Sequence, residues 1–424
     1  MTMISVEEAL SKVLNLITVL KPEKKPILES LGQVLAEDVY APFNIPPKNN
    51  SAMDGYAVNL KSIIGASKDN PKVLHVSGNL PAGADAELRI EHGSAVRIMT
   101  GAFVPEGADM VVPFEDTDEF DRRSHGYASD EIRIFTELPL GSNIRKSGED
   151  IEKGELVLTK GKGLRPADIG MLASMGRNII SVIRRPQIAI ISTGDEIVDI
   201  NQPLPPGKIY NSNTYSLAAL VLRYGGIPKI LGIIKDNIKL VSDTLRRVFD
   251  CDMILTSGGV SLGDFDVVKD VLTVEGDISF WRVCMKPGKP IAFGMFNSEK
   301  GERIPHLGLP GNPVSAMITF EIFVRPAILK MMGSTNLDKQ EIEAIIEDSV
   351  VNTDGRRIFT RVKIDKRNDT YFARLTGPQG SGILKSMVQA DGLAIIHETV
   401  KEVKPGDTVK VLMLNWDDIR TPYI

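Results

Sequence analysis

The sequence predicts a multidomain protein in which a doubly wound α/β domain accompanies β-rich domains. Its 424 residues exceed what one core organises, since domains commonly run to about 100–200 residues. Between residues 185 and 333, continuous apolar runs alternate with amphipathic helical segments, which indicates a parallel sheet with helices on both faces. At residues 46–140 and 334–424, short apolar runs lie between turn residues, a pattern typical of β structure.

The N-terminal part of the chain predicts a helix followed by mixed structure. ISVEEALSKVLNLITVL has helical periodicity, Ser5 and Glu8 can form a capping box, and Lys21-Pro22 ends the helix. Residues 141–184 return to mixed structure. We expect them to join residues 1–45 in one discontinuous domain, with the β-rich domain at 46–140 as an insertion.

The two β-rich regions are predicted from their short apolar runs. In the insertion these runs are VLHVSGNL, SAVRIMTG, DMVVPFED and EIRIFTEL. After Met332 they are IEAIIEDSV, IFTRVKI, YFARLTG, GLAIIHE and DTVKVLML. The pattern alone does not decide between a barrel and a sandwich for the C-terminal domain, residues 334–424, and we expect a β-barrel-like domain.

The α/β domain has the clearest pattern. Its expected strands are QIAIIST, KILGIIKD, DMILTSGG and ISFWRVCM, and its expected helices are TYSLAALVLRYGG, KLVSDTLRRVFD and DVVKDVLTV. Gly225 and Gly226 end the first helix as a C-cap should. Ligands of such sheets bind beyond the carboxyl ends of the strands. We therefore expect the functional site in the polar loops that follow these strands.

Composition excludes several classes of protein. The chain has 50 Lys and Arg against 55 Asp and Glu, a formal charge of −5 without a basic half, so nucleic acid and anionic membranes are poor partners. Two cysteines exclude a disulfide framework, and five scattered histidines show no zinc-ligand spacing. No apolar run reaches the roughly 18 residues of a membrane span, and the N-terminus lacks a signal pattern. We expect a cytoplasmic protein.

Three loops in the α/β domain are candidates for binding an anion. Ser257–Ser261 is small and glycine-rich, and Pro310–Asn312 leads into a helix with Asn312 as N-cap and Pro313 at the first helical position. Lys286 and Lys289 stand on either side of a Pro-Gly turn. Each loop alone also fits a tight turn, an ordinary helix start or solvated lysines. Together on one sheet edge they favour a shared anionic ligand.

Acidic residues lie close to these loops. They are Asp195 and Glu196, Asp236, and Asp264 and Asp266. A carboxylate beside a phosphate site is explained if Mg²⁺ lies between the two, although any one of these acids could instead cap a helix. Outside this domain, Asp54 in NSAMDGYAV and Glu149-Asp150 in RKSGEDI also fit ordinary turns.

These motifs together resemble a known enzyme family. NSAMDGYAV, RIMTGAFVPEGADMVV, RKSGEDI, ISTGDEIV, PPGKIYNSN, TSGGVSLGDFD, MKPGKPIAFG and GLPGNPVSA are similar, in this order, to the motifs of the molybdopterin molybdenumtransferases, which include the E domain of gephyrin. TSGG and LPGNP also occur in the related molybdopterin adenylyltransferases. SAMDGYA and the flanking β domains distinguish this chain from them.

The resemblance implies a fold, a reaction and partners. Family members are homodimers of four-domain subunits, and the SAMDGYA domain of one subunit completes the cleft of the other. The substrates are adenylylated molybdopterin and molybdate, with Mg²⁺ as cofactor and tungstate as an alternative oxyanion. Cleavage of the pyrophosphate link releases AMP and molybdenum cofactor. The molybdopterin adenylyltransferase is a further expected partner.

The resemblance also implies residue roles. The expected catalytic residues are Asp54, Asp150, Glu196, Asp266 and Lys286. The expected substrate-binding residues are Thr100, Ser257, Gly258, Gly259, Ser261, Pro310, Gly311 and Asn312. The expected molybdate contacts are Lys289, Pro290, Ser315, Arg361 and Ser381, and the expected metal ligands are Glu196, Asp264 and Asp266.

Departures from the family pattern are modest: Leu262 replaces the usual valine, and Asp391 replaces a common asparagine. Two other functions stay open from the sequence. An adenylyltransferase acting on the same pterin would need only the α/β domain. A non-catalytic scaffold of the same fold would need an exposed apolar groove, and no segment marks one.

Overall fold

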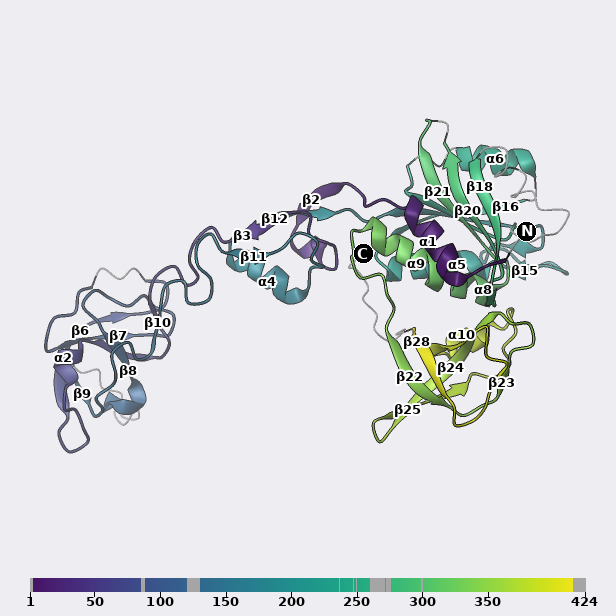
Figure 1. Cartoon of the computed structure of the whole chain (residues 1–424). Helices are drawn as coiled ribbons and strands as arrows, with labels where there is room; N and C mark the ends of the chain where they lie inside the picture. Colours follow the sequence, from purple (N-terminus) through teal and green to yellow (C-terminus); the bar gives the residue numbers. More distant parts are fainter. Residues whose placement is uncertain are drawn as a thin grey trace. The chain divides into compact units, whose positions relative to one another are not determined.

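The structure, a computed structural model, describes residues 3–84, 88–119, 130–235, 237–246, 248, 250–259, 271, 276–298 and 300–414 (Figure 1). The chain divides into two compact units. The larger unit comprises Met1–Glu37, Lys160–Ala173 and Arg177–Ile424, and the smaller unit comprises Asp38–Thr159 and Ser174–Gly176. The finer division into four domains stays a prediction.

A seven-stranded sheet forms the centre of the larger unit. Its order is β1-β18-β20-β21-β17-β13-β16. The strands are β1 (Met3–Ile4), β13 (Gln187–Thr193), β16 (Ile227–Ile234), β17 (Met253–Ser257), β18 (Gly276–Val283), β20 (Pro290–Asn297) and β21 (Arg303–Leu309). The strands β16, β13, β17 and β21 pair in parallel.

The expectation of a purely parallel sheet is wrong at one side. β20 runs antiparallel to both β18 and β21. The links at residues 284–289 and 298–302 are too short for a crossover, which needs about a dozen residues or more, so these strands turn back directly.

Helices cover both faces of this sheet, and β13 supplies apolar side chains to both faces in alternation. Ile188 and Ile190 join the core beneath one group of helices, whereas Ala189 and Ile191 join the core beneath another helix. The first group is α1 (Val6–Leu16), α5 (Ser212–Arg223), α8 (Pro313–Thr319), the π-helical turn η4 (Phe320–Val324) and α9 (Arg325–Met331), and the opposite helix is α6 (Ile238–Arg246). The doubly wound α/β class is confirmed.

Helix ends follow the sequence signals in two cases. Ser5 caps α1 by accepting a hydrogen bond from the Glu8 backbone N–H at 3.0 Å. Gly225 ends α5 with φ of 87°, and the Gly226 N–H reaches the Val221 carbonyl at 2.9 Å. Within the described residues, no helix is long and apolar enough to span a membrane.

The C-terminal region is a closed five-stranded barrel rather than a sandwich. It comprises β22 (Glu341–Ile346), β24 (Arg357–Arg367), β25 (Thr370–Leu375), β26 (Gly392–Ile396) and β28 (Thr408–Met413), and the β24–β26 pairing closes it. Beside it lie β19 (Met285–Lys286), α10 (Leu384–Val388), and the pair β23 (Val350–Val351) and β27 (Glu402–Val403). Phe359 and Leu393 of the barrel also belong to the core of the central sheet.

Smaller elements complete the larger unit. They are β2 (Pro22–Pro26) paired with β12 (Ile179–Ile183), β14 (Ile197–Val198) paired with β15 (Ile209–Tyr210), and the helices η1 (Leu28–Ser30) and α4 (Pro166–Ser174), the last of which ends in the smaller unit.

The smaller unit contains a five-stranded sheet of order β8-β5-β7-β6-β9. Its elements are β5 (Gly55–Val58), β6 (Lys72–Leu80), β7 (Ser94–Ile98), β8 (Met110–Pro113), β9 (Glu131–Ile134), α2 (Leu60–Ile63) and η2 (Phe114–Asp116). Two short pairs accompany it, β3 (Val39–Tyr40) with β11 (Leu156–Leu158), and β4 (Asn50–Ser51) with β10 (Ile144–Arg145). The β-rich character predicted for this region is confirmed.

Candidate functional site

Two predicted ligand loops meet at the carboxyl edge of the central sheet. β17 and β21 are parallel neighbours, with Ser257 opposite Leu309, so the loops that follow them start side by side. The Gly258 N–H donates to the Leu309 carbonyl at 3.1 Å. A Cβ added to Gly311 would lie 3.7 Å from the Gly258 Cα. Ser257–Gly259 and Pro310–Asn312 therefore form one surface.

Gly258 is required by both its backbone and its neighbour. Its φ of 90° lies in the left-handed region, and an added Cβ would lie 2.8 Å from the Thr193 carbonyl oxygen at the end of β13. Gly259 has φ of 69°, so two successive residues adopt this conformation. Turn conformations can point backbone N–H groups toward an anion, and here the Gly258 N–H is already bonded to the Leu309 carbonyl.

Asn213 joins the two loops, and the sequence prediction had not included it. Its Nδ2 donates to the Ser257 Oγ at 2.7 Å and to the Gly311 carbonyl at 2.8 Å. In the sequence PPGKIYNSN, asparagines before a helix indicate capping, and Asn211 does cap α5. The second asparagine carries no local signal, because its partners are distant in the sequence.

The start of α8 is covered by the C-terminal barrel region. Asn312 is the N-cap residue and Pro313 the first helical residue, as predicted, but the Asn312 side chain makes no capping hydrogen bond. The Val314 N–H instead donates to the Ser381 carbonyl at 3.1 Å. Of the predicted molybdate contacts, Ser381 therefore lies beside the residue that precedes the buried Ser315.

The two predicted lysines lie on a turn that the barrel and α8 hold in place. β19 pairs in parallel with the first residues of β24, so Lys286 stands opposite Ile358. Lys286 is exposed and its Nζ lies 3.8 Å from the Asp354 carboxylate. Lys289 and Pro290 are more buried than Lys286.

Gly288 lies between the two lysines and rests on α8. An added Cβ would lie 2.6 Å from the Thr319 Oγ1, and φ is 102°. Ser315 and Thr319 are four residues apart on α8 and so share a face. The lysine turn and Ser315 are therefore on the same side of the helix.

Arg361 is buried and braces the loop that carries Ser381. Its side chain is 1% exposed; its Nε donates to the Ser386 Oγ at 3.0 Å and its Nη2 to the Gly380 carbonyl at 3.1 Å. Desolvation lowers the pKa of the guanidinium to about 10. Its described contacts are thus to the protein, and its contact with molybdate stays a prediction.

The predicted metal ligands can be located only in part. Glu196 is exposed after β13, and its carboxylate folds back over Gly194, where an added Cβ would lie 2.5 Å from Oε2. Ser261, Asp264, Asp266 and the acidic residue Asp236 lie outside the described residues. Within the described part of the chain, no three His, Cys, Asp or Glu side chains gather in a metal-binding arrangement. Magnesium binding therefore stays a prediction.

In the smaller unit, two predicted site residues are bonded to each other. Both the backbone N–H and the hydroxyl of Thr100 donate to the Asp54 Oδ1, each at 2.7 Å. Asp150 is exposed in a turn, where its N–H donates to the Ile45 carbonyl at 3.0 Å. Asp54 and Thr100 therefore act as a pair, a contact between residues 46 positions apart.

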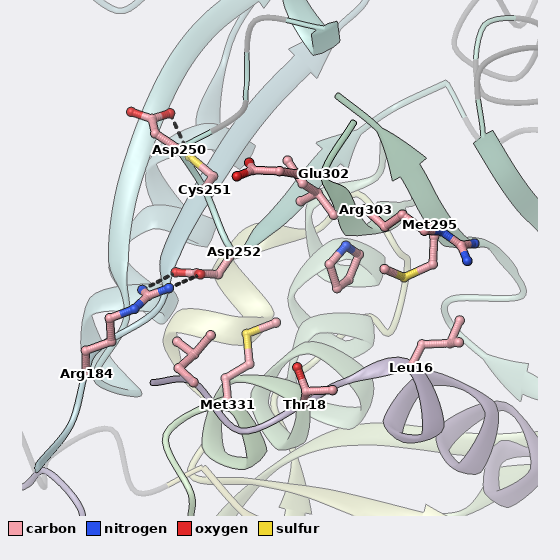
Figure 2. Close-up of a pocket in the computed structure, with 13 residues that line it drawn as sticks. Leu16, Thr18, Arg184, Asp250, Cys251, Asp252, Met295, Glu302, Arg303 and Met331 are labelled. Atoms are coloured by element: carbon pink, nitrogen blue, oxygen red, sulfur yellow. Dashed lines mark hydrogen bonds and ion pairs between the residues drawn. The ribbon is translucent and has the colours of Figure 1, made fainter. Parts of the chain in front are cut away.

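A pocket of about 490 Å³ lies elsewhere, at the amino ends of β13, β17 and β21 (Figure 2). It is lined by Leu16, Thr18, Leu20, Arg184, Asp250, Cys251, Asp252, Met295, Glu302, Arg303, Ile304, Pro305 and Met331. Asp252 directly precedes β17 and is paired with Arg184 at 2.7 Å. None of the predicted site residues that the structure describes lines this pocket.

The chain matches three family profiles in succession. They are the MoeA N-terminal region (domains I and II) over residues 4–176, a probable molybdopterin binding domain over residues 189–330, and the MoeA C-terminal region (domain IV) over residues 343–414. Molybdopterin molybdenumtransferase 2 of Mycobacterium tuberculosis (strain H37Rv) is 36% identical over 420 residues, covering 97% of this chain and 99% of that protein. Molybdopterin molybdenumtransferase of Haemophilus influenzae is 34% identical with the same coverage.

A solved structure has the same fold. The crystal structure of the molybdopterin biosynthesis MoeA protein from Pyrococcus horikosii matches with a TM-score of 0.81 and 32% identity, over 97% of this chain and 99% of that chain. Fold and site thus define a multidomain protein built around an α/β domain of the molybdopterin-binding type. The chain belongs to the molybdopterin molybdenumtransferase family, also described as MoeA, and the resemblance carried by its motifs is confirmed.

Proposed function

We propose that this chain inserts molybdenum into adenylylated molybdopterin, cleaving the pyrophosphate link and releasing AMP and molybdenum cofactor. The observation that carries the proposal is the junction of the Ser257–Gly259 and Pro310–Asn312 loops at the carboxyl edge of the sheet. Backbone N–H groups of these two loops suit the phosphate of the pterin. The two lysines beside this junction suit oxyanions.

Molybdate, the second substrate, would bind where the barrel meets α8. Lys289, Pro290, Ser315 and Ser381 supply a cation, backbone and hydroxyl groups there, and Arg361 holds the loop that presents Ser381. Molybdate is a tetrahedral oxyanion, so hydrogen-bond donors and a compact cation recognise it. The same chemistry accepts tungstate.

Mg²⁺ would neutralise charge on the phosphate oxygens of the cleaved link when it is bound. Glu196, Asp264 and Asp266 are the residues that would hold it, because carboxylates are its preferred protein ligands. Lys286 would stabilise the departing phosphate. We further propose a homodimer in the cytoplasm, in which Asp54, Thr100 and Asp150 of one subunit complete the cleft of the other.

The test is AMP release from adenylylated molybdopterin with Mg²⁺, in the presence and absence of molybdate. We expect AMP together with active cofactor when all components are present. A molybdopterin adenylyltransferase would instead consume ATP and release pyrophosphate. A scaffold would bind the pterin and release no nucleotide, and this result would reject the proposed reaction.

Asp266→Asn should preserve the fold but strongly reduce AMP release, because an amide is a poorer Mg²⁺ ligand than a carboxylate. The Mg²⁺ concentration that gives half-maximal rate should rise in this variant. Asp243→Asn, on α6 of the same domain, is the matched control. An unchanged Mg²⁺ requirement in Asp266→Asn would remove this residue from the metal site.

A further inference from the structure

We propose that Asn213 is a positioning residue of the anion site, which fixes the two ligand loops relative to each other and orients the Ser257 hydroxyl toward the ligand. The inference rests on the proposed function, because it concerns how the same site holds the phosphate of its substrate. It assigns a role to a side chain that lies between the predicted loops.

Both N–H groups of the Asn213 carboxamide donate hydrogen bonds. A side-chain amide nitrogen carries two hydrogens. One is directed to the Ser257 Oγ at 2.7 Å and the other to the Gly311 carbonyl at 2.8 Å. One side chain thus spans the loop after β17 and the loop after β21, and a shorter neutral side chain would bridge neither.

This donation determines what the Ser257 hydroxyl can do. Its oxygen accepts from Asn213, so its own hydrogen points elsewhere. Ser257 is 3% exposed, and within the described residues its hydroxyl has no other partner. A hydroxyl proton fixed in this way can donate to a phosphate oxygen, and the Gly311 carbonyl, which would repel that oxygen, is kept occupied.

Asn213 is itself held rigidly by the buried start of α5. Asn211 caps the helix by accepting from the Thr214 N–H at 3.2 Å and donates to the Thr214 Oγ1 at 2.9 Å. The Thr214 hydroxyl also lies 2.7 Å from the Ser192 Oγ on β13. Because this network ties the helix start to the sheet, Asn213 keeps its position when no ligand is bound.

The experiment compares two variants of Asn213 with two matched controls. Asn213→Ala removes both hydrogen bonds. Asn213→Asp keeps the shape of the side chain but replaces the donating amide nitrogen with a carboxylate oxygen, which accepts hydrogen bonds and adds a negative charge. Ser212→Asp adds the same charge one residue earlier at an exposed position, and Ser216→Ala removes a hydroxyl one turn later that donates to the Asn213 carbonyl. Aspartate in the first turn of a helix is favourable, so both aspartate variants should fold.

We expect KM for adenylylated molybdopterin in AMP release to rise roughly tenfold or more in both Asn213 variants, because the Ser257 hydroxyl would no longer be oriented to donate to the charged phosphate. kcat should change much less, because the lost interaction binds substrate and transition state alike. Equilibrium binding of adenylylated molybdopterin should weaken by the same factor. Ser212→Asp and Ser216→Ala should stay near the wild type.

The wild type in the same assay separates two kinds of failure. If it releases no AMP, the proposed function is wrong and the inference falls with it. If it is active while both Asn213 variants keep the KM and affinity of their controls, only the role of Asn213 is wrong. A loss in Asn213→Asp that Ser212→Asp reproduces, with Asn213→Ala unchanged, would also reject the positioning role, because charge alone would then explain it.

Discussion

At the scale of single residues, His306 is held neutral inside the sheet. It is fully buried on β21, and its Nε2 lies 3.1 Å from the Thr256 hydroxyl. Burial lowers the pKa of the imidazole to about 3 because the charged form would lose its hydration. The residue therefore contributes as a packed polar group.

The low pKa predicts a pH dependence of stability. In the unfolded chain His306 binds a proton below about pH 6.5, whereas the folded protein resists protonation until about pH 3, so stability falls as the pH drops through this window. Between pH 7 and pH 5 the wild type should lose about 2 kcal/mol more than His306→Gln in urea unfolding. Replacing the exposed His397 with Gln is the control, and equal pH dependence in wild type and His306→Gln would contradict the prediction.

At the scale of elements, a buried ion pair joins η4 to the segment leading into the barrel. The Lys339 Nζ donates to the Glu321 Oε2 at 2.7 Å and to the Tyr224 hydroxyl at 2.9 Å. The Tyr224 hydroxyl also donates to Glu321, whose side chain is 1% exposed. Burial lowers the pKa of Lys339, and the Glu321 carboxylate opposes this effect.

Lys339→Met should destabilise the larger unit by about 3–5 kcal/mol, because it leaves the Glu321 carboxylate buried without its cation. The double variant Glu321→Leu/Lys339→Met should recover most of this loss, since no charge is left uncompensated. Urea unfolding of both variants and of Glu321→Leu completes the cycle. If Lys339→Met and the double variant Glu321→Leu/Lys339→Met were destabilised equally, the pairing of the two charges would not contribute to stability.

At the scale of elements, the sequence predicted features with local signals and missed features that depend on distant residues. Apolar continuity predicted β13 and β17, and Gly225 and Gly226 predicted the end of α5, because these signals are local. The antiparallel direction of β20 follows from the short links before and after it, and the apolar pattern did not show where those links begin and end. Asn213 and the Asp54–Thr100 pair were beyond local signals, because their partners lie tens of residues away.

At the scale of the whole molecule, the proposed dimer predicts complementation between inactive chains. Purified heterodimers of Asp54→Asn and Asp266→Asn chains should recover about half the wild-type AMP release, because one of the two clefts receives both intact residues from different subunits. Differently tagged chains allow these heterodimers to be isolated, and sedimentation gives their oligomeric state.

The reciprocal heterodimer is the control for that experiment. When one chain carries both substitutions and the other is wild type, every shared cleft contains one substitution, so AMP release should be lost. If each cleft were built within a single chain, the outcomes would be reversed: the first heterodimer would be inactive and the second half active. A monomeric protein would reject the shared cleft directly.

The pairing of β1 with β18 also bears on the order in which a growing chain folds. Met3 pairs with Arg282, so the first strand is synthesised long before its neighbour in the sheet. The described strands of the smaller unit are complete by Leu158, so its core can assemble when β1 is the one strand of the central sheet, among those described, that has been made. Until β20, η4 and α9 have also been synthesised, the apolar face of α1 lacks the surface on which it packs in the folded protein, so this helix has to be kept from associating with other chains.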